Sequence, residues 1–292
     1  MLLMVLKNIF NKISIFLPDK IFLKIKFRYH FGYRLDLNNP KSYNEKLQWL
    51  KIYNRNPLYT KLVDKYEVRK YIAETIGEEY LIPLIGVYDN VEEIDWPKLP
   101  KQFVLKCTHG SGANIICKDK DKLNIQKAKK QLKKWMRRNW YWYGREWPYK
   151  NVKPRIICEK FLQEADGEQI KDYRIFCFNG VPKFITVDFD IINKKNTRRN
   201  LYDLDWNLLD YGISYPRELS IKVERPKRID EMIKISKILA KDKPHVRVDF
   251  YCLDTKIYFG EMTFYHQSGY GKVYPESFGR KIGDWIKLPN NN

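Results

Sequence analysis

The stretch FVLKCTHGSGANIICKDK, residues 103–120, decides how the rest of this chain is interpreted. Its apolar runs predict two short strands, 103–107 and 113–118, joined by the glycine-rich loop HGSG. Lys106 lies at the end of the first strand, directly before that loop. In one interpretation the glycines supply turn dihedrals and the serine caps a backbone donor. In the other, the loop is a flap whose backbone N–H groups and neighbouring lysine bind a phosphate.

Neither interpretation is settled by a known loop motif, because the P-loop pattern G-x-x-x-x-G-K-[ST] does not occur in the chain. The 292 residues are 44% hydrophobic, which is enough for one large domain or for two lobes with cores. A formal net charge of +20 predicts attraction to polyanions, among them nucleotides, acidic sugars and an anionic membrane face. No pattern typical of nucleic-acid-binding modules is present, so we expect no nucleic-acid partner.

The five cysteines lie in apolar runs without any C-x-x-C pair. They predict buried free thiols in a reducing compartment, and therefore a cytoplasmic protein. The four histidines are scattered, and no zinc-type spacing occurs.

The first 20 residues, MLLMVLKNIFNKISIFLPDK, contain an apolar stripe at helical spacing over residues 1–17. The stretch is too short and too polar to span a bilayer, and it lacks the features of a signal peptide. Two interpretations stay open: a helix packed on its own domain, or a helix on an anionic membrane surface at the inner face of the cell membrane.

Along the rest of the chain, helical and strand patterns are mixed. Helices are expected at 43–54, 63–80, 124–140 and 229–240, and strands at 155–161, 173–178, 183–188, 245–252 and 256–262. The helix at 124–140 is strongly basic, which is typical of a solvated face or of a contact with an acidic polymer or lipid. This mixture predicts an α+β protein with two lobes. We divide the chain into a helical N-terminal segment (1–62), an N-lobe (63–153) and a C-lobe (154–292).

The stretch HVRVDFYCLDTKIYFGEMTF, residues 245–264, contains charged side chains within apolar strands. Arg247 and Asp249 are two apart and share one side of their strand, as do Glu261 and Thr263. Buried carboxylates need partners or a metal. Two carboxylates with a third oxygen donor suit Mg²⁺, whereas Arg247 could instead form a salt bridge with either carboxylate. Both interpretations stay open.

The stretch IICEKFLQ, residues 156–163, is a strand that runs into Glu-Lys-Phe-Leu. It is either a hinge that offers backbone groups to an adenine edge, with Phe161 and Leu162 flanking the ring, or an edge strand with a solvated Glu159.

Taken in order, these signals resemble the ATP-grasp superfamily, whose two α+β lobes clamp ATP between them. The hinge and the Arg-x-Asp and Glu-x-Thr pairs resemble those of D-alanine–D-alanine ligases. Five motifs look like the TupA-like ATP-grasp family of bacterial polysaccharide loci, and together they run from about residue 40 to 288. They are YNEKLQWL, DKYEVRKYI, FVLKCTHGSGANI, DYRIFCFNGVPKF and GEMTFYHQSGY.

The resemblance implies a site for ATP. Lys106 would hold the α- and β-phosphates, and Lys65, expected on a helix, would be a second lysine on the phosphate side. The residues that would close over the β- and γ-phosphates are Gly110, Ser111 and Gly112. The residues that would form the adenine hinge are Glu159, Lys160, Phe161 and Leu162.

The resemblance also implies a Mg²⁺ site, with Asp249 and Glu261 as ligands and Thr263 as a further oxygen donor. Arg247 would face the transferring phosphoryl group. Many ATP-grasp enzymes have asparagine at the place of Thr263, so a second metal would be held more weakly here. The residues that would meet phosphate are Arg174 or, as the weaker candidate, Lys183.

The activity implied is that of an ATP-dependent, ADP-forming carboxylate–amine ligase. It would join an amino acid or small amine to a uronic-acid carboxylate of a surface glycan or its precursor. The alternative is a glycosyltransferase of the same pathways, for which DFD (188–190) and DLD (203–205) are candidate metal motifs.

Overall fold

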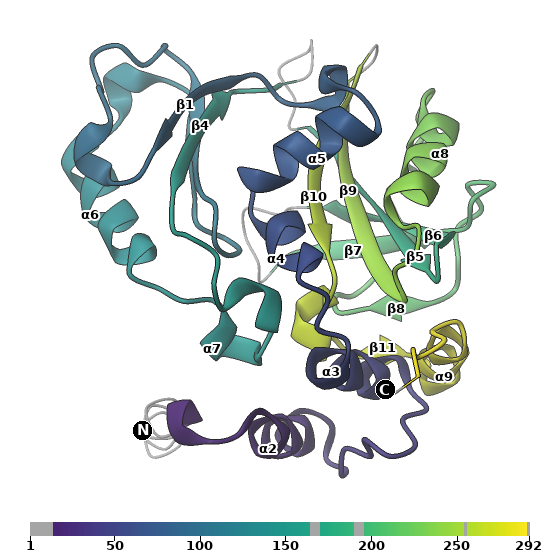
Figure 1. The fold of residues 1–292 in the computed structure, drawn as a ribbon. Helices are drawn as coiled ribbons and strands as arrows, with labels where there is room; N and C mark the ends of the chain where they lie inside the picture. The colour runs from purple at the N-terminus through teal and green to yellow at the C-terminus, as the bar shows by residue number, and fades with distance from the viewer. Residues whose placement is uncertain (1–13, 164–169, 190–195, 254–255, 291–292) are drawn as a thin grey trace.

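Two antiparallel sheets form the two lobes of the protein, and they are drawn at the left and the right of Figure 1. The computed structural model describes residues 14–163, 170–189, 196–253 and 256–290. Helices and strands are mixed throughout, as expected for an α+β protein.

The smaller sheet has the strand order β1-β4-β2-β3. Its strands are β1 (Leu84–Tyr88), β2 (Phe103–Cys107), β3 (Asn114–Cys117) and β4 (Ile156–Lys160). The hairpin predicted at residues 103–118 is confirmed as β2 and β3, which pair antiparallel. Alternate β2 residues, among them Phe103 and Leu105, enter a core that α6 (Ile125–Met136) closes with Ala128 and Leu132. Lys106 lies on the other face of β2, toward the second lobe.

The position of β4 differs from the expectation. We placed this strand in the C-lobe and considered it an edge strand, but it lies between β1 and β2 in the smaller sheet. Both of its edges are paired, Ile156 and Cys158 face the core of the smaller sheet, and four of its five residues are buried. The division of the chain at residues 62 and 153 stays a prediction.

The larger sheet has the strand order β10-β9-β5-β6-β7. Its strands are β5 (Asp172–Phe178), β6 (Val181–Phe189), β7 (Arg198–Tyr202), β9 (His245–Leu253) and β10 (Lys256–Thr263). Helix α8 (Ile229–Leu239) packs on one face (Figure 1). The predicted strands of this sheet are confirmed with shifted ends, but β7 was missed. Its sequence RRNLY begins with polar residues that do not announce a buried strand.

The N-terminal helices pack against the larger sheet in one continuous core. They are α2 (Asp19–Phe31), α3 (Tyr43–Tyr53), α4 (Leu58–Val63) and α5 (Glu67–Thr75). The single helix predicted at 63–80 is wrong at both ends, because the chain forms α5 followed by the 3₁₀ turn η2 (Glu78–Tyr80). Asp64 Oδ1 accepts a hydrogen bond from the Tyr66 backbone N–H (2.8 Å), which favours a turn before α5. Lys65 therefore lies in that turn and not on a helix.

The remaining elements are short. They are η1 (Ser14–Phe16), η3 (Val91–Glu93), η4 (Lys120–Lys122), α7 (Tyr141–Gly144), η5 (Trp147–Tyr149), β8 (Gly212–Ile213), η6 (His266–Gly269), β11 (Val273–Tyr274) and α9 (Glu276–Asp284). Strands β8 and β11 pair as a separate ribbon. All five cysteines are free, and four are buried.

The amphipathic helix predicted at residues 1–17 falls mostly outside the described residues, which begin at Ser14. Among the described helices, none combines the length and the apolar character that a membrane crossing requires.

Candidate functional site

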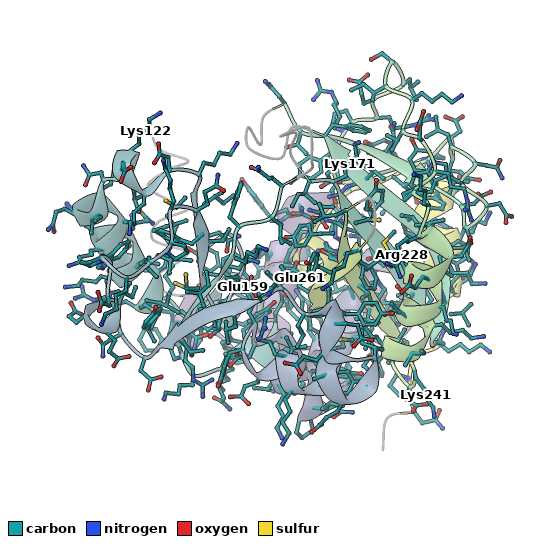
Figure 2. All side chains as sticks on the ribbon, turned by 90° about the horizontal axis from the view of Figure 1, so that it is seen from above. Lys122, Glu159, Lys171, Arg228, Lys241 and Glu261 are labelled. Carbon is teal, nitrogen blue, oxygen red and sulfur yellow. The ribbon has the colours of Figure 1, made fainter. Side chains whose placement is uncertain are left out.

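A cavity of about 1340 Å³ lies between the two lobes. In Figure 2, Glu159 of the smaller sheet and Glu261 of the larger one both lie toward the middle of the molecule, whereas Lys122 and Lys241 lie at its periphery. Most of the predicted site residues line this cavity. They are Lys65, Lys106, Ser111, Gly112, Glu159, Lys160, Phe161, Leu162, Arg174, Arg247, Asp249, Glu261 and Thr263.

Two predicted residues do not line the cavity. Gly110 is buried, and its carbonyl oxygen accepts a hydrogen bond from Lys65 Nζ (2.7 Å), a residue that does line the cavity. Lys183 is exposed on β6, with its ammonium over the Trp285 ring at 5.6 Å. The candidate phosphate contact from Lys183 is therefore not supported, because its ammonium is held away from the cavity.

Lys106 extends from the cavity face of β2 and binds Glu159 of the neighbouring strand, with 2.7 Å between Nζ and Oε2. Glu159 also receives Arg69 Nη1 at 3.1 Å. Burial disfavours the charge on Lys106, but Glu159, Tyr251 and Glu261 together outweigh it and raise the pKa of the lysine above its usual value. Lys106 is thus a permanently charged ammonium at the cavity wall. Glu159 is buried and ion-paired, so the interpretation of it as a solvated residue is wrong.

The glycine-rich hairpin loop is connected to the opposite lobe through Lys65. Besides the bond to Gly110, Lys65 Nζ lies 3.7 Å from Glu261 Oε2 on β10. Gly112 has a left-handed φ of +71°, which fits the turn interpretation. Its place on the cavity wall, next to Ser111, fits the flap interpretation as well.

Strands β9 and β10 bring Asp249 and Glu261 opposite one another. The pairing runs regularly up to Phe259 and then shifts by one residue at Gly260. Without this β-bulge, Gly260 would face Asp249 and Glu261 would turn to the other side of the sheet. A side chain at Gly260 would have its Cβ 3.0 Å from the Asp249 carbonyl oxygen, so glycine suits this position.

Arg247 binds both carboxylates. Its Nε donates to Asp249 Oδ1 (2.6 Å), and its Nη2 donates to Glu261 Oε1 (3.0 Å). The predicted salt bridge is therefore present. Burial raises the pKa of Glu261, but Lys65, Arg247 and Arg174, with the hydrogen bond from Thr263, together outweigh it and lower that pKa to about 2. Burial raises the pKa of Asp249, and Arg247 opposes this rise.

The same carboxylates also fit a magnesium ion. Thr263 Oγ1 donates to Glu261 Oε1 (3.1 Å), so a third oxygen lies beside the two carboxylates. No described group of three or more His, Cys, Asp or Glu residues could hold a metal by itself. Mg²⁺ is commonly bound by one or two carboxylates with phosphate oxygens completing its shell, so two carboxylates are sufficient when a nucleotide is present.

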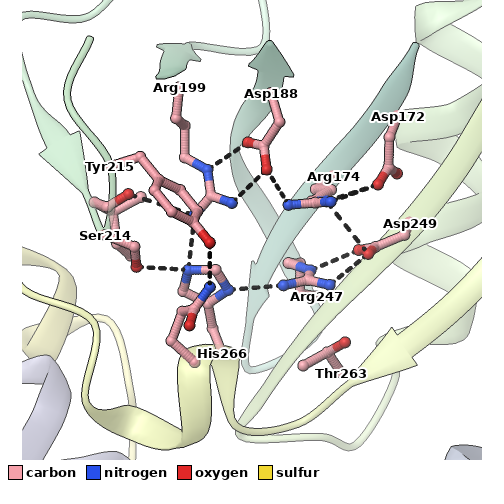
Figure 3. Close-up of polar contacts among 12 residues, drawn as sticks. Asp172, Arg174, Asp188, Arg199, Ser214, Tyr215, Arg247, Asp249, Thr263 and His266 are labelled. Atoms are coloured by element: carbon pink, nitrogen blue, oxygen red, sulfur yellow. Dashed lines mark hydrogen bonds and ion pairs between the residues drawn. The ribbon is translucent and has the colours of Figure 1, made fainter. Parts of the chain in front are cut away.

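A network of arginines and aspartates continues from this pair across the larger sheet (Figure 3). Arg174 contacts Asp172 (Nη2 to Oδ2, 2.6 Å), Asp188 and Asp249 (Nε to Oδ2, 3.6 Å). Asp188 in turn binds Arg199, with 2.5 Å between Oδ1 and Nε. Arg174 thus reaches the cavity with three carboxylates already around it, so a phosphate there would have to compete with them.

His266 joins this network to Arg247. Arg247 Nη1 lies 2.7 Å from Nδ1 of His266, and Arg199 Nη1 and Ser214 Oγ lie 2.9 and 3.1 Å from Nε2. Burial, with these arginines, holds the pKa of His266 well below its usual value, so the ring is neutral. Asp172, Arg199 and His266 were not predicted from the sequence as site residues. Asp172 could have been predicted, because it and Arg174 are charged residues at alternate positions of an apolar strand.

The first aspartate of each candidate metal motif for glycosyl transfer already binds other residues of the protein. Asp188 is enclosed by two arginines, and Asp190 lies outside the described residues. Asp203 accepts hydrogen bonds from the backbone and side chain of Asn207 (2.7 and 2.9 Å), which makes it a turn residue.

The expected adenine hinge begins where β4 ends. The Lys160 backbone N–H donates to the Pro83 carbonyl oxygen (3.0 Å), so pairing uses this backbone group. Phe161 and Leu162 come after the strand and line the cavity together with Val104 and Tyr251. These apolar side chains could flank a planar ring, and the backbone groups available for a hinge are those beyond Lys160.

Comparisons with known proteins agree with this geometry at the level of a family. The family model described as TupA-like ATPgrasp matches residues 45–287 of the chain. A comparison with curated protein sequences finds no match.

Similar solved structures include ligases and a synthetase. D-alanine–D-alanine ligase from Bacillus anthracis, complexed with ATP, is 16% identical over 70% of this chain and 55% of that chain, with a TM-score of 0.42. The Helicobacter pylori D-alanine–D-alanine ligase is 14% identical over 86% and 70% of the two chains, with a TM-score of 0.45. N5-carboxyaminoimidazole ribonucleotide synthetase from Thermus thermophilus is 10% identical over 75% and 51%, with a TM-score of 0.41. The chain thus covers little more than half of the first of these structures.

Proposed function

Because the chain belongs to the TupA-like ATP-grasp family, we propose that it is an ATP-dependent ligase that joins a carboxylate to an amine. The observation that carries the proposal is the meeting of charges from both lobes in one cavity. Lys106 comes from the smaller sheet, Arg247 with its two carboxylates comes from the larger one, and Lys65, in the turn before α5, contacts both Gly110 and Glu261.

These charges pair with one another when no ligand is present. Mg²⁺·ATP carries both signs of charge, so it would exchange partners with them: the phosphates bind the lysines and arginines, and the carboxylates bind the metal. Bound at Asp249 and Glu261, Mg²⁺ would neutralise charge on the phosphate oxygens. Lys106 would hold the α- and β-phosphates, and the loop with Ser111 and Gly112 would close over the β- and γ-phosphates.

The reaction would proceed in two steps. A carboxylate oxygen of the acceptor attacks the terminal phosphorus of ATP, which gives an acyl phosphate and releases ADP. The amine nitrogen then attacks the acyl carbon, phosphate leaves, and the nitrogen loses a proton as the amide forms. Arg247 would face the transferring phosphoryl group with its planar guanidinium. Such chemistry depends on positioning and charge neutralisation, which agrees with a site built of lysines, arginines and carboxylates.

For the substrates, we propose a uronic-acid carboxylate as acceptor and an amino acid or small amine as donor, in the synthesis of a bacterial surface polysaccharide. The net charge of +20 supports an acidic acceptor. We also propose a cytoplasmic protein that contacts an anionic membrane peripherally.

A screen for ADP release tests the activity. Uronic acids are combined pairwise with amino acids and small amines, with Mg²⁺·ATP present, and amide products are identified by mass spectrometry. We expect ADP release that requires both an acid and an amine. Hydrolysis or transfer of a nucleotide sugar without ATP would instead favour the glycosyltransferase alternative. Absence of ATP binding altogether would refute the ligase proposal.

A further inference from the structure

The cavity is larger than one nucleotide requires. Pockets for single small ligands measure roughly 300–1,000 Å³, whereas this one measures about 1340 Å³. Its lining continues past Arg247 to the β8–β11 ribbon and the segment that follows β10. In Figure 3, Ser214 and Tyr215 lie on the opposite side of His266 from Arg247 and Asp249. We call this part the ribbon end of the cavity, and its residues used below are Ser214, Tyr215, Gln267, Tyr270, Lys272 and Tyr274.

The ribbon end contains unusual backbone. Gln267, Ser268 and Gly269 follow one another with left-handed φ angles of 48°, 54° and 68°. Residues other than glycine rarely adopt such angles, and the cost persists only where surrounding structure enforces them. Strain of this kind is typical of ligand-binding segments.

Side chains of helix α3 hold this backbone in place through hydrogen bonds. Asn44 Nδ2 donates to the carbonyl oxygens of Gly269 (3.0 Å) and Gly271 (2.9 Å), and Gln48 Nε2 donates to Gly269 (3.0 Å). Lys51 Nζ donates to the carbonyl oxygens of Ser268 (2.7 Å) and Gly144 (2.6 Å).

The three donors lie at positions i, i+4 and i+7 of the helix and therefore share one face. All three are buried, and Gln48 and Lys51 are 0% exposed. Asn44 and Gln48 of the YNEKLQWL motif, with Lys51 directly after it, thus hold the strained segment of GEMTFYHQSGY. These residues position the segment and do not line the cavity themselves.

The ribbon is packed just as closely. A Cβ at Gly212 would lie 1.9 Å from the Tyr274 ring, and one at Gly271 would lie 2.2 Å from Ser214 Oγ. A side chain at either position would force Tyr274 or Ser214 to move. Tyr274 packs on Gly212, and its hydroxyl donates to the Tyr215 carbonyl oxygen. These contacts order the ring before a ligand arrives, which lowers the entropic cost of binding.

The wall combines aromatic faces with positive charge. Tyr215 and Tyr274 offer surfaces on which the apolar face of a sugar ring could pack, whereas His30, Lys26 and Lys51 already lie against the Tyr270 ring. Ser214 and Gln267 offer hydrogen-bonding groups for hydroxyls. Lys272 is exposed at this end, and no ion pair of its side chain occurs with any residue in the described part of the chain. The Glu146 carboxylate also lines the cavity, but its residue is buried. Burial raises the pKa of Glu146, and Lys51 opposes this rise.

We propose that the ribbon end is the acceptor subsite, and that it takes a sugar acid carrying a second anionic group, which Lys272 binds. This inference rests on the proposed function, in which the reacting carboxylate attacks the phosphoryl group that Arg247 faces. The second group is a phosphate when the acceptor is a nucleotide- or lipid-linked sugar, and a further carboxylate when the acceptor is an acidic polymer.

Calorimetry on the full chain, with Mg²⁺ and a non-hydrolysable ATP analogue, tests this inference with three probes. They are glucuronic acid, glucuronic acid 1-phosphate and digalacturonic acid. We expect at least one of the two probes with a second anionic group to bind about tenfold more tightly than glucuronic acid, the effect of one charge-assisted hydrogen bond. Lys272→Ala should remove that advantage and leave glucuronic acid binding unchanged. Lys272→Arg should restore most of it.

The matched control is Lys237→Ala, which removes an exposed charge from α8, away from the cavity. It should bind all three probes as the wild type does. If Lys272→Ala weakens binding of glucuronic acid 1-phosphate, the second anionic group is a phosphate. If it weakens binding of digalacturonic acid, the group is a carboxylate. Equal binding of all probes to wild type and Lys272→Ala, or no probe binding at all, would overturn the inference. If the ATP analogue still binds in that case, the proposed function stands; if the analogue itself fails to bind, the proposed function fails.

Discussion

At the scale of single residues, Lys106 provides the sharpest test of the nucleotide site. Its ammonium is ion-paired with Glu159, which Arg69 also binds, so removing the lysine leaves the buried carboxylate with a partner. We therefore expect Lys106→Ala to fold, but to bind Mg²⁺·ATP at least about tenfold more weakly, because a charge-assisted contact to phosphate is lost. Calorimetry gives the affinity and thermal melting gives the fold.

Lys122→Ala is the control, since its side chain is 86% exposed at the periphery of the same lobe (Figure 2). If folded Lys106→Ala binds ATP as well as this control does, the hairpin is only a turn and the phosphate flap does not exist.

The facing carboxylates provide a second test. Asp249→Asn and Glu261→Gln should each lower turnover by about a hundredfold or more, because each removes a charged ligand of the ion that neutralises phosphate. Thr263→Ala should be milder, since water can replace a neutral ligand. Arg247→Lys should be damaging despite its retained charge, because an ammonium cannot reproduce a planar fork on phosphate. ADP release and melting temperature are measured on the same preparations.

The salt bridges of Arg247 give the opposing expectation. If Asp249 and Glu261 serve only to pair with Arg247, their variants lose stability first, and activity falls only with the unfolded fraction. Near-wild-type turnover of folded Asp249→Asn and Glu261→Gln would show that this hairpin is not a metal site.

At the scale of elements, His245 connects α3 to the larger sheet. Its Nδ1–H donates to the Phe264 carbonyl oxygen (2.7 Å), and its Nε2 therefore accepts from the Tyr43 hydroxyl (3.1 Å). This arrangement requires a neutral ring. Burial lowers the pKa of His245 from 6.5 to about 4.

This depressed pKa makes the stability of the protein depend on pH. Between about pH 6.5 and 4 the unfolded chain binds a proton at His245 and the folded chain does not, so stability falls as the pH falls through this window. The contribution is at most about 3 kcal/mol. Urea unfolding at several pH values should show a steeper acid loss for the wild type than for His245→Gln. Identical pH dependence of the two proteins would contradict a neutral buried His245.

Elements also show what the sequence could and could not predict. Strands β2, β5 and β9 were predictable because each has a run of apolar residues that a sheet interior requires. The central position of β4 could not be predicted, because the order of strands in a sheet depends on pairing between segments that are far apart in the sequence. Nor could the bulge at Gly260 be predicted, although it alone turns Glu261 toward Asp249. Local pattern identified the carboxylates, and pairing geometry brought them together.

At the scale of the whole molecule, the positive charge and an exposed apolar stripe on α2 favour contact with a membrane surface. Ile21, Ile25 and Tyr29 are 47%, 45% and 74% exposed and lie four residues apart on one side of the helix. The opposite side packs Leu23 and Phe27 into the core. Exposed basic residues beside the stripe are Lys20, Lys24 and Arg28. A helix with apolar residues flanked by lysines and arginines is typical of an interfacial helix on anionic lipid.

We therefore expect the protein to sediment with vesicles that contain anionic lipid, and to be released as the salt concentration rises. Ile21→Glu combined with Ile25→Glu should abolish this sedimentation and leave the melting temperature nearly unchanged, because both side chains are already largely in water. Ile238→Glu is the control: this residue is 42% exposed on α8, at a different face of the molecule.

Truncation tests the segment before α2. It should remove residues 1–13 only, because Arg145, which is 1% exposed, donates hydrogen bonds to the carbonyl oxygens of Ser14 and Leu17. Deleting those acceptors would leave a buried guanidinium short of partners and would confuse lost binding with lost stability. If residues 1–13 belong to an interfacial helix, their removal weakens vesicle binding and preserves the melting temperature. A large fall in melting temperature would show that they pack in the core, and unchanged sedimentation of both this truncation and the double isoleucine variant would refute the membrane contact.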